Sequence, residues 1–256
     1  MTKQKIGIIG CGWLGKPLAK RLIEEGFTVS GTTRTSENLA LLISQGLEAY
    51  QFDLAEQSAL PELFLDVELL IIATPHKTIA DYPNLISQIA ESKVKQVIYT
   101  SSTSVYQSGL AVTEASATNP ESPLVKIEQL FMSSHGFKTS VIRFGGLIGP
   151  GRDPGHFFKS GKPIPRPNGH VNMIHLMDCI QIICKMIKDN YFPTILNAVS
   201  PNHPKRKDYY TNAFKAAGRP IPEFDDSSTD PDKIVEADLV KNGLKYQFIQ
   251  DNTIIY

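Results

Sequence analysis

Residues 5–15 read KIGIIGCGWLG and join a strand-like segment to a helix-like one. The apolar run predicts a short buried strand over Lys5–Ile9, and apolar residues at helical spacing predict a helix over Leu14–Glu24. The turn between them carries glycine at positions 10, 12 and 15, in the pattern G-x-G-x-x-G. In such a turn the first glycine permits a tight bend, and the second lets backbone N–H groups approach a pyrophosphate. The third lets the helix pack closely against the strand.

This turn predicts a dinucleotide site, because the N-terminus of the following helix adds about half a positive charge that faces the anion. The residues that we expect to contact the dinucleotide are Gly10, Cys11, Gly12, Trp13, Leu14 and Gly15. A packing turn whose glycines are accidental is the alternative.

Beyond this turn, strand-like and helix-like segments alternate, which predicts a parallel sheet with crossover helices. The expected strands are Lys5–Ile9, Thr28–Gly31, Glu48–Gln51, Leu69–Ala73, Gln96–Thr100, Thr139–Arg143 and Ile195–Val199. The expected helices are Leu14–Glu24, Glu37–Ser44, Tyr82–Glu91, Leu124–Ser134, Met177–Lys188, Lys207–Ala217 and one near Ala237–Asn242. Because such crossovers are right-handed, we expect an α/β protein with a doubly wound, Rossmann-type parallel sheet.

The composition changes after Gly149, where residues 149–155 and 161–169 are rich in proline and glycine. Such a stretch is unsuited to regular structure and is typical of a segment that covers a ligand. We therefore expect a dinucleotide-binding domain at residues 1–150, to which 176–200 return. Residues 151–175 and 201–256 are expected to form a small, discontinuous substrate-binding region at the C-terminal side of the chain.

The end of the second strand selects between the two nicotinamide dinucleotides. NAD-binding units usually place an acidic residue there to hold the ribose 2′-hydroxyl. Here Thr33 and Arg34 stand in its place, and no carboxylate appears before Glu37. A guanidinium beside hydroxyls suits a 2′-phosphate, so NADP(H) is favoured, with NAD(H) as the other possibility and a solvated loop arginine as the alternative.

Other strand ends complete the expected cofactor site. The backbone of Ala73, Thr74 and Pro75 follows the fourth strand and should pass the cofactor, and Thr100 ends the fifth strand. His76, next to Pro75, is either a general acid or a solvent-facing loop histidine.

Several later blocks resemble one family when they are taken together. They are YTSSTSVY at residues 99–106, Thr113-Glu114, Asn119-Pro120, RFGGLIGPG at residues 143–151, VNMIHLMD at residues 171–178, and Asn197. This order resembles the extended short-chain dehydrogenases/reductases, which include nucleotide-sugar epimerases and dehydratases. The Gly-Trp-Leu-Gly turn and the Ser-Ser-Thr-Ser-Val-Tyr run are similar to the atypical, YeeZ-like subgroup.

The resemblance implies a catalytic Ser, Tyr and Lys, of which only two are present. By position the Ser is Ser102 and the Lys, which also binds the nicotinamide ribose, is Lys126; Ser122 stands where the Tyr is expected. An aliphatic hydroxyl is a far weaker acid than a phenol, so Ser122 does not inherit proton transfer. Tyr106 is a replacement acid or a pocket wall. Ser102 is either catalytic or a strand-end hydrogen-bonding group, and Lys126 is either a ribose ligand or a surface lysine.

Outside these blocks, three histidines raise the question of a metal site, and several cations raise the question of a site for a substrate anion. His156, His170 and His175 lack the spacing of a zinc site, so we expect no metal; His175 with Asp178 is expected to be a structural pair or part of the pocket lip. Arg152 and Arg166 either hold a substrate phosphate or carboxylate or remain solvated. The run Lys205-Arg206-Lys207 is either a solvated helix start or a flank of the substrate cleft.

The overall composition argues against nucleic acid and anionic membranes as binding partners. The chain has 256 residues, with 26 Lys and Arg against 26 Asp and Glu, so no basic footprint for nucleic acid or an anionic membrane is present. Three cysteines form no disulfide framework, and no run is long enough for a signal peptide or a membrane span, so we expect a cytoplasmic protein. Whether it forms a homodimer is left open by the sequence.

We therefore expect an NADP(H)-binding oxidoreductase or epimerase-like protein that acts on a small polar or nucleotide-linked substrate. Because the Tyr is absent, enzymatic activity is left open. The alternative is a catalytically degenerate NADP(H)-binding sensor or regulatory module.

Overall fold

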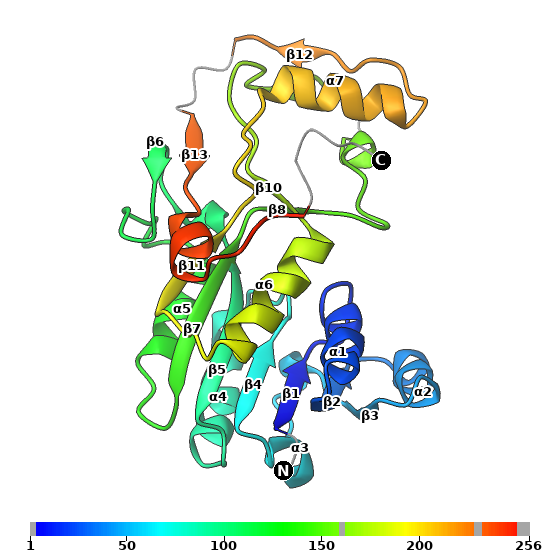
Figure 1. The fold of residues 1–256 in the computed structure, drawn as a ribbon, viewed down its shortest axis with the longest axis vertical. Coiled ribbons are helices and arrows are strands. Elements are labelled where there is room, and N and C mark those ends of the chain that lie inside the picture. Colours follow the sequence, from blue (N-terminus) through cyan, green and yellow to red (C-terminus); the bar gives the residue numbers. More distant parts are fainter. Residues whose placement is uncertain (1–3, 159–161, 228–231, 250–256) are drawn as a thin grey trace. The chain divides into compact units, whose positions relative to one another are not determined.

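A computed structural model describes residues 4–158, 162–227 and 232–249. Seven strands form one parallel sheet in the order β11-β7-β5-β4-β1-β2-β3 (Figure 1). Its strands are β1 (Lys5–Ile9), β2 (Thr28–Thr33), β3 (Glu48–Gln51), β4 (Leu69–Ile72), β5 (Gln96–Ser102), β7 (Lys138–Phe144) and β11 (Ile195–Ala198). The crossover from β3 back to β4, on the other side of β1, gives the doubly wound arrangement that the sequence predicts.

Except for the short α3, which the sequence did not predict, the helices follow the predicted periodicity, with ends displaced by one or two residues. They are α1 (Gly15–Glu24), α2 (Ser36–Ser44), α3 (Glu62–Leu65), α4 (Tyr82–Ala90), α5 (Pro123–Met132), α6 (Leu176–Lys188) and α7 (Arg206–Ala216). The helix expected near Ala237–Asn242 is a single π-helical turn, Leu239–Gly243. Within the part of the chain that the structure describes, no helix combines the length and apolar character needed to cross a membrane.

The chain divides into two compact units. Unit 1 comprises Met1–Ser101, Pro120–Ile142 and Phe192–Ile195, and unit 2 comprises Ser102–Asn119, Arg143–Tyr191 and Leu196–Tyr256. Each unit therefore contains segments that lie far apart in the sequence.

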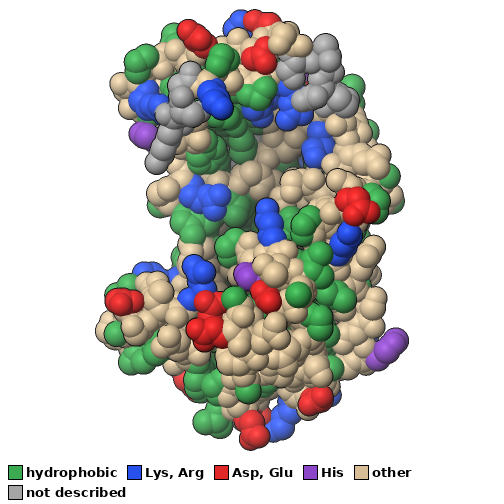
Figure 2. Space-filling model, turned by 180° about the vertical axis from the view of Figure 1, so that it is seen from behind, with side chains coloured by type: hydrophobic (Ala, Val, Ile, Leu, Met, Phe, Trp, Pro, Cys, Tyr) green, Lys and Arg blue, Asp and Glu red, His purple; other side chains and the backbone are tan. Residues whose placement is uncertain are grey.

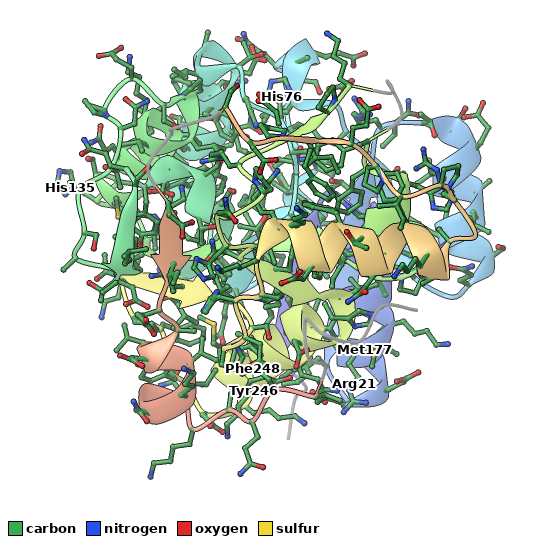
Figure 3. All side chains as sticks on the ribbon, turned by 90° about the horizontal axis from the view of Figure 1, so that it is seen from above. Arg21, His76, His135, Met177, Tyr246 and Phe248 are labelled. Carbon is green, nitrogen blue, oxygen red and sulfur yellow. The ribbon has the colours of Figure 1, made fainter. Side chains whose placement is uncertain are left out.

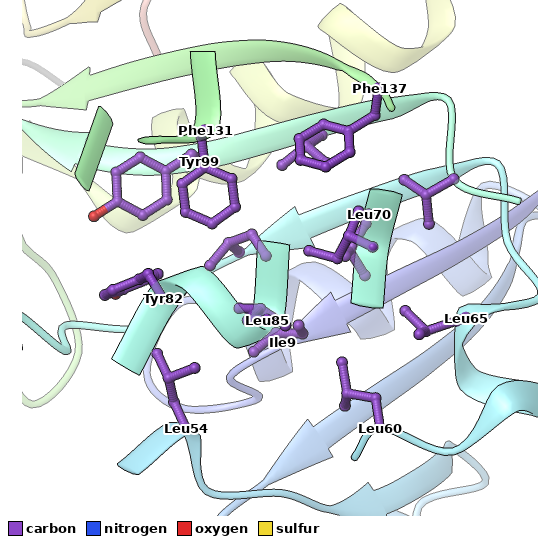
Figure 4. Close-up of a cluster of buried hydrophobic side chains, with 14 of the residues drawn as sticks. Ile9, Leu54, Leu60, Leu65, Leu70, Tyr82, Leu85, Tyr99, Phe131 and Phe137 are labelled. Carbon is purple, nitrogen blue, oxygen red and sulfur yellow. The ribbon is translucent and has the colours of Figure 1, made fainter. Parts of the chain in front are cut away.

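The core of unit 1 covers one face of the sheet. Side chains alternate along a strand, and on this face the sheet contributes Ile9, Leu70, Ile72, Val97 and Tyr99. Helices α4 and α5 cover them with Tyr82, Leu85, Ile127 and Phe131, and the rings of Tyr99 and Phe131 stack with their centroids 5.0 Å apart (Figure 4). The intervening residues, such as Ile8 and Ile71, are fully buried on the opposite face. Burial of both faces explains why these strands read as continuous apolar runs.

Unit 2 contains three short strand pairs, all parallel. They are β8 (Gly146–Ile148) with β10 (Met173–His175), β9 (Ile164–Pro165) with β12 (Phe224–Asp225), and β6 (Gly109–Val112) with β13 (Lys233–Val235). Helix α7 packs here through Tyr209, Tyr210 and Phe214.

The final described segment is attached to α6. Tyr246 and Phe248 lie side by side, with ring centroids 5.3 Å apart (Figure 3). The hydroxyl of Tyr246 and the backbone N–H of Ile249 both donate to Oδ1 of the fully buried Asp178, at 2.7 and 2.8 Å. Asp178 is thereby a structural acceptor in the first turn of α6.

Candidate functional site

The glycine turn after β1 is closely packed at its first and third glycines. Gly10 has φ +95°, and a Cβ built on it would lie 2.7 Å from the carbonyl oxygen of Ala73 at the end of β4. A Cβ on Gly15 would lie 2.2 Å from the carbonyl oxygen of Gly10. Both glycines are therefore required by the fold itself, one for backbone conformation and contact with β4 and the other for the entry into α1.

Gly12 differs from its neighbours because the fold does not require it. A Cβ at this position meets nothing within 4 Å, and the φ of Gly12 lies outside the left-handed region. Helix α1 begins three residues later with no side-chain cap and with no acidic residue in its first turn. The turn thus leaves open space in front of an uncapped helix N-terminus, which is the geometry that lets a phosphate approach backbone N–H groups.

Cys11 lies within this turn but is not a reactive thiol. Its side chain is buried against Gly31 of β2, where a Cβ would come within 2.3 Å of Sγ. Burial raises the pKa of the Cys11 thiol to about 12. The residue therefore fills space under the turn.

The end of β2 lies beside the turn and presents hydroxyls and one cation. The Thr32 hydroxyl accepts a hydrogen bond from the backbone N–H of Gly10 at 3.2 Å, which fixes the first glycine to β2. Thr33 is buried, whereas Arg34 is exposed. The Thr35 side chain accepts from the N–H of Asn38 and caps α2. Arg34 is thus the exposed cation next to the turn, where the sequence predicts a 2′-phosphate.

The end of β4 is positioned against β1 by the N–H of Ala73, which donates to the carbonyl of Ile9 at 2.8 Å. The side chain of Thr74 accepts from the N–H of His76, and Pro75 is exposed. The His76 imidazole pairs with the carboxylate of Asp81 at 2.5 Å. The backbone carbonyl of His76 accepts a hydrogen bond from the Tyr82 hydroxyl. His76 is therefore a fixed part of this loop, in contact with a carboxylate.

Two further predicted residues of unit 1 are also engaged. The Thr100 hydroxyl donates to the carbonyl of Ile72 at 3.0 Å and joins the ends of β5 and β4. Lys126, on α5, donates to the Glu121 carboxylate at 2.8 Å, and both side chains are exposed. Ser122 is the N-cap of α5 and makes no side-chain capping bond.

The other two catalytic candidates belong to unit 2. The Ser102 hydroxyl accepts from the N–H of Ser104 at 3.1 Å and caps a short 3₁₀ turn. Tyr106 is buried; its hydroxyl donates to Oδ1 of Asn197 at 2.7 Å, and the Arg143 guanidinium lies 4.7 Å from its ring centroid. Burial raises the pKa of Tyr106, although Arg143 opposes this effect. A buried phenol with a raised pKa is a poor proton donor near neutrality.

A pocket of about 270 Å³ lies wholly within unit 2. Its polar lining includes Ser102, Ser104, Asn172, the pair His170 and Asp232, and the cations Arg166, Arg206 and Lys233. Figure 2 shows Lys and Arg side chains in blue on this unit, at the top of the view. Arg166 and the run containing Arg206 are candidates from the sequence, whereas Asp232 and Lys233 are not, because no motif links these two residues to the rest.

His175 and His156 each pair with a residue close to them in the sequence. His175 caps α6 by accepting from the N–H of Met177 at 3.2 Å, and burial lowers the pKa of its imidazole. His156 pairs with Asp153 at 3.2 Å. Among residues 4–158, 162–227 and 232–249, no group of three or more His, Cys, Asp and Glu side chains is arranged to hold a metal ion.

The sheet order and the glycine turn define a Rossmann-type α/β fold, and comparison with known proteins specifies the family. Residues 2–115 match the NmrA-like family. The chain is 30% identical to protein YeeZ of Escherichia coli K12 over 267 aligned residues, which cover 96% of each chain. It therefore belongs to the same family as protein YeeZ.

Solved structures share its fold at low sequence identity. A conserved protein of unknown function from Silicibacter pomeroyi has a TM-score of 0.79 and 22% identity, with 98% of this chain and 96% of that chain covered. The UDP-glucuronic acid 4-epimerase of Bacillus cereus, solved in complex with NAD, has a TM-score of 0.75 and 17% identity, with 98% and 95% covered.

Proposed function

We propose that this chain binds a nicotinamide dinucleotide, with a preference for NADP(H), and acts as an oxidoreductase or epimerase-like enzyme on a small polar or nucleotide-linked substrate. The observation that carries the proposal is Gly12, since the space beside its Cα is open and lies in front of the uncapped N-terminus of α1. Neither packing nor backbone conformation requires glycine there, whereas a diphosphate held by backbone N–H groups does.

Different residues of the chain would bind different parts of the dinucleotide. The turn from Gly10 to Gly15 would hold the diphosphate, and Arg34 beside Thr33 would grip the 2′-phosphate of NADP(H). The bound cofactor would supply hydride transfer. The NAD complex of the Bacillus cereus epimerase supports a nicotinamide dinucleotide in this fold.

A specific observation also favours the alternative, an NADP(H)-binding sensor. Ser122 occupies the position of the family's Tyr, and Lys126 is paired with Glu121. A chain that has lost its proton-transfer group would retain cofactor binding and lose turnover.

Calorimetric titration with NADPH, NADP, NADH and NAD tests the cofactor assignment. Arg34→Ala should weaken NADPH binding about 10- to 100-fold and leave NADH binding nearly unchanged, because it removes a charge-assisted hydrogen bond to the 2′-phosphate. Lys95→Ala is the matched control, since it removes an exposed cation at the amino end of β5, whereas Arg34 follows the carboxyl end of β2. Failure of all four dinucleotides to bind would refute the proposal.

NADPH oxidation across a panel of aldehydes, ketones and nucleotide sugars then separates the two functions. Sustained turnover with any member supports the enzyme. Binding of NADPH without turnover across the panel favours the sensor.

A further inference from the structure

The pocket of unit 2 gathers three cations from three separate segments. Arg166 follows β9, Arg206 is the first residue of α7, and Lys233 is the first residue of β13. Cations repel one another, so three of them around one hollow require a compensating charge.

The guanidinium of Arg166 has N–H donors that are available to a ligand. No residue in the described part of the chain forms a hydrogen bond or an ion pair with its guanidinium. Its backbone has φ +56°, in the left-handed region, and the N–H of Gly169 donates to its carbonyl at 3.1 Å. A non-glycine residue in this conformation is strained, and the surrounding turn holds it there.

Arg206 is oriented by its neighbours. Its Nε donates to the carbonyl of Pro165 at 3.0 Å, and its guanidinium lies 5.3 Å from the ring centroid of Tyr210. Burial lowers the pKa of Arg206, and the charge of Arg166 lowers it further. An anion in the pocket would relieve this repulsion.

Lys233 contributes the third charge. Its ammonium donates to the carbonyls of Thr103 and Tyr106, both at 3.1 Å, which leaves one of its three N–H donors for a ligand. Burial lowers its pKa, and so does the charge of Arg166.

Among the described lining residues, the one carboxylate, Asp232, already has hydrogen-bond partners. Oδ1 of Asp232 accepts from the backbone N–H groups of His170 and Lys233 at 2.8 and 2.7 Å, and Oδ2 pairs with the His170 imidazole. Burial alone would raise the pKa of Asp232, but these bonds with His170 and Lys233 hold it below the ordinary value. Among the described lining residues, three cations against one carboxylate leave two positive charges in excess, without counting His170.

The size and lining of the pocket restrict the ligand. About 270 Å³ lies just below the ~300–1,000 Å³ of typical sites for drug-sized ligands. No Phe, Tyr or Trp is among the described lining residues, so a nucleobase would have no aromatic ring to stack on. The hydroxyls of Ser102 and Ser104, beside the cations, suit a compact group with several oxygens.

From this arrangement we infer that the pocket binds the phosphate of a small phosphomonoester, held by Arg166, Arg206 and Lys233, in preference to a nucleotide-linked compound. A dianionic phosphate matches the charge excess, and guanidinium groups bind phosphate oxygens in pairs. The inference names a substrate class, and it rests on the proposed function only in treating this ligand as the substrate.

Calorimetry on the full chain tests the site with three probes: inorganic phosphate, glycerol 3-phosphate and UDP-glucose. The main variant is Arg166→Asn, which removes no side-chain hydrogen bond or ion pair to a described residue and keeps a residue that tolerates the left-handed conformation. The matched control is Lys207→Gln, which removes an exposed cation from α7 next to Arg206 but outside the lining. Native and variant chains are compared by thermal unfolding to confirm folding.

Glycerol 3-phosphate should bind saturably and more tightly than UDP-glucose. Its affinity should fall at least about tenfold in Arg166→Asn and less than about twofold in Lys207→Gln. The inference is overturned by equal affinity in Arg166→Asn, by equal losses in both variants, by tighter binding of UDP-glucose, or by no saturable binding. A dinucleotide titration of the same preparation separates the two proposals, because dinucleotide binding without phosphate binding refutes only the pocket assignment, and the reverse refutes only the cofactor assignment.

Discussion

Replacing Gly12 with alanine should separate ligand binding from folding, because the new Cβ meets no protein atom within 4 Å. The φ of Gly12 is also accessible to alanine. The loss of glycine's freedom in the unfolded chain should leave the free energy of unfolding unchanged or raise it by up to about 1 kcal/mol. Gly10→Ala is the comparison. Its Cβ would lie 2.7 Å from the Ala73 carbonyl oxygen at a φ of +95°, so it should lower the free energy of unfolding by about 1–3 kcal/mol.

The effect of Gly12→Ala on binding should be large. The added methyl group occupies the space in front of α1 and keeps a diphosphate away from the backbone N–H groups. Loss of a charge-assisted hydrogen bond costs about 1.5–3 kcal/mol, so the Kd for NADPH should rise about 10- to 100-fold. Urea unfolding measures the first quantity, and calorimetry measures the second.

Two results would refute this reasoning. If Gly12→Ala unfolds as readily as Gly10→Ala, the fold itself needs this glycine. If Gly12→Ala is stable and binds NADPH as the native chain does, the open space beside residue 12 does not receive the diphosphate.

Three further outcomes are expected. The native chain at pH 8 should show almost no reaction with a thiol reagent, and the denatured chain should show three equivalents, because every cysteine is buried; fast native labelling would contradict this for Cys11, Cys179 and Cys184. Tyr106→Phe should lower the free energy of unfolding in urea by about 1–3 kcal/mol, because a buried acceptor on Asn197 loses its donor; an unchanged urea midpoint would show that the bond contributes nothing. In the folded chain, burial lowers the pKa values of His175 and His203 below the ordinary 6.5. As the pH falls through about 6.5, the unfolded chain therefore binds more protons than the folded chain, and the free energy of unfolding should decrease from pH 7.5 to pH 5.5. A higher urea midpoint at pH 5.5 would show that the sign is wrong, and the variant His203→Gln should reduce the slope.

The sheet was predictable because its strands are short apolar runs with turn residues on both sides. Strands β1 and β3 begin and end where the sequence places them. Strand β2 extends two residues beyond the prediction, to Thr33, because threonines that resemble a loop are buried and one of them bonds to Gly10.

The short strands of unit 2 could not be read from local pattern. Strand β6 has four residues and pairs with β13, whose first residue, Lys233, is paired with Gly109 far along the chain. Such pairing depends on tertiary contacts, which override local propensity in strands this short.

Candidate site residues were predictable where they lie close together in the sequence, and they were not predictable where the fold brings distant segments together. The glycine turn is contiguous, so its spacing is visible in the sequence, although only the structure separates Gly12 from the glycines that packing requires. The pocket of unit 2 draws Arg166, Arg206 and Lys233 from three segments, and nothing in the sequence marks Lys233 as their neighbour.

The bonds between Asp178 and the last described residues have a consequence for how the protein is made. Until Tyr246 and Ile249 have been synthesised, this buried carboxylate lacks two of its donors, and α6 would enclose an under-solvated charge. Unit 2 also takes its final segment from residue 196 onward. The nascent chain therefore cannot complete this unit until residues 246–249 have been synthesised, and the apolar surface of the unfinished unit stays exposed until then.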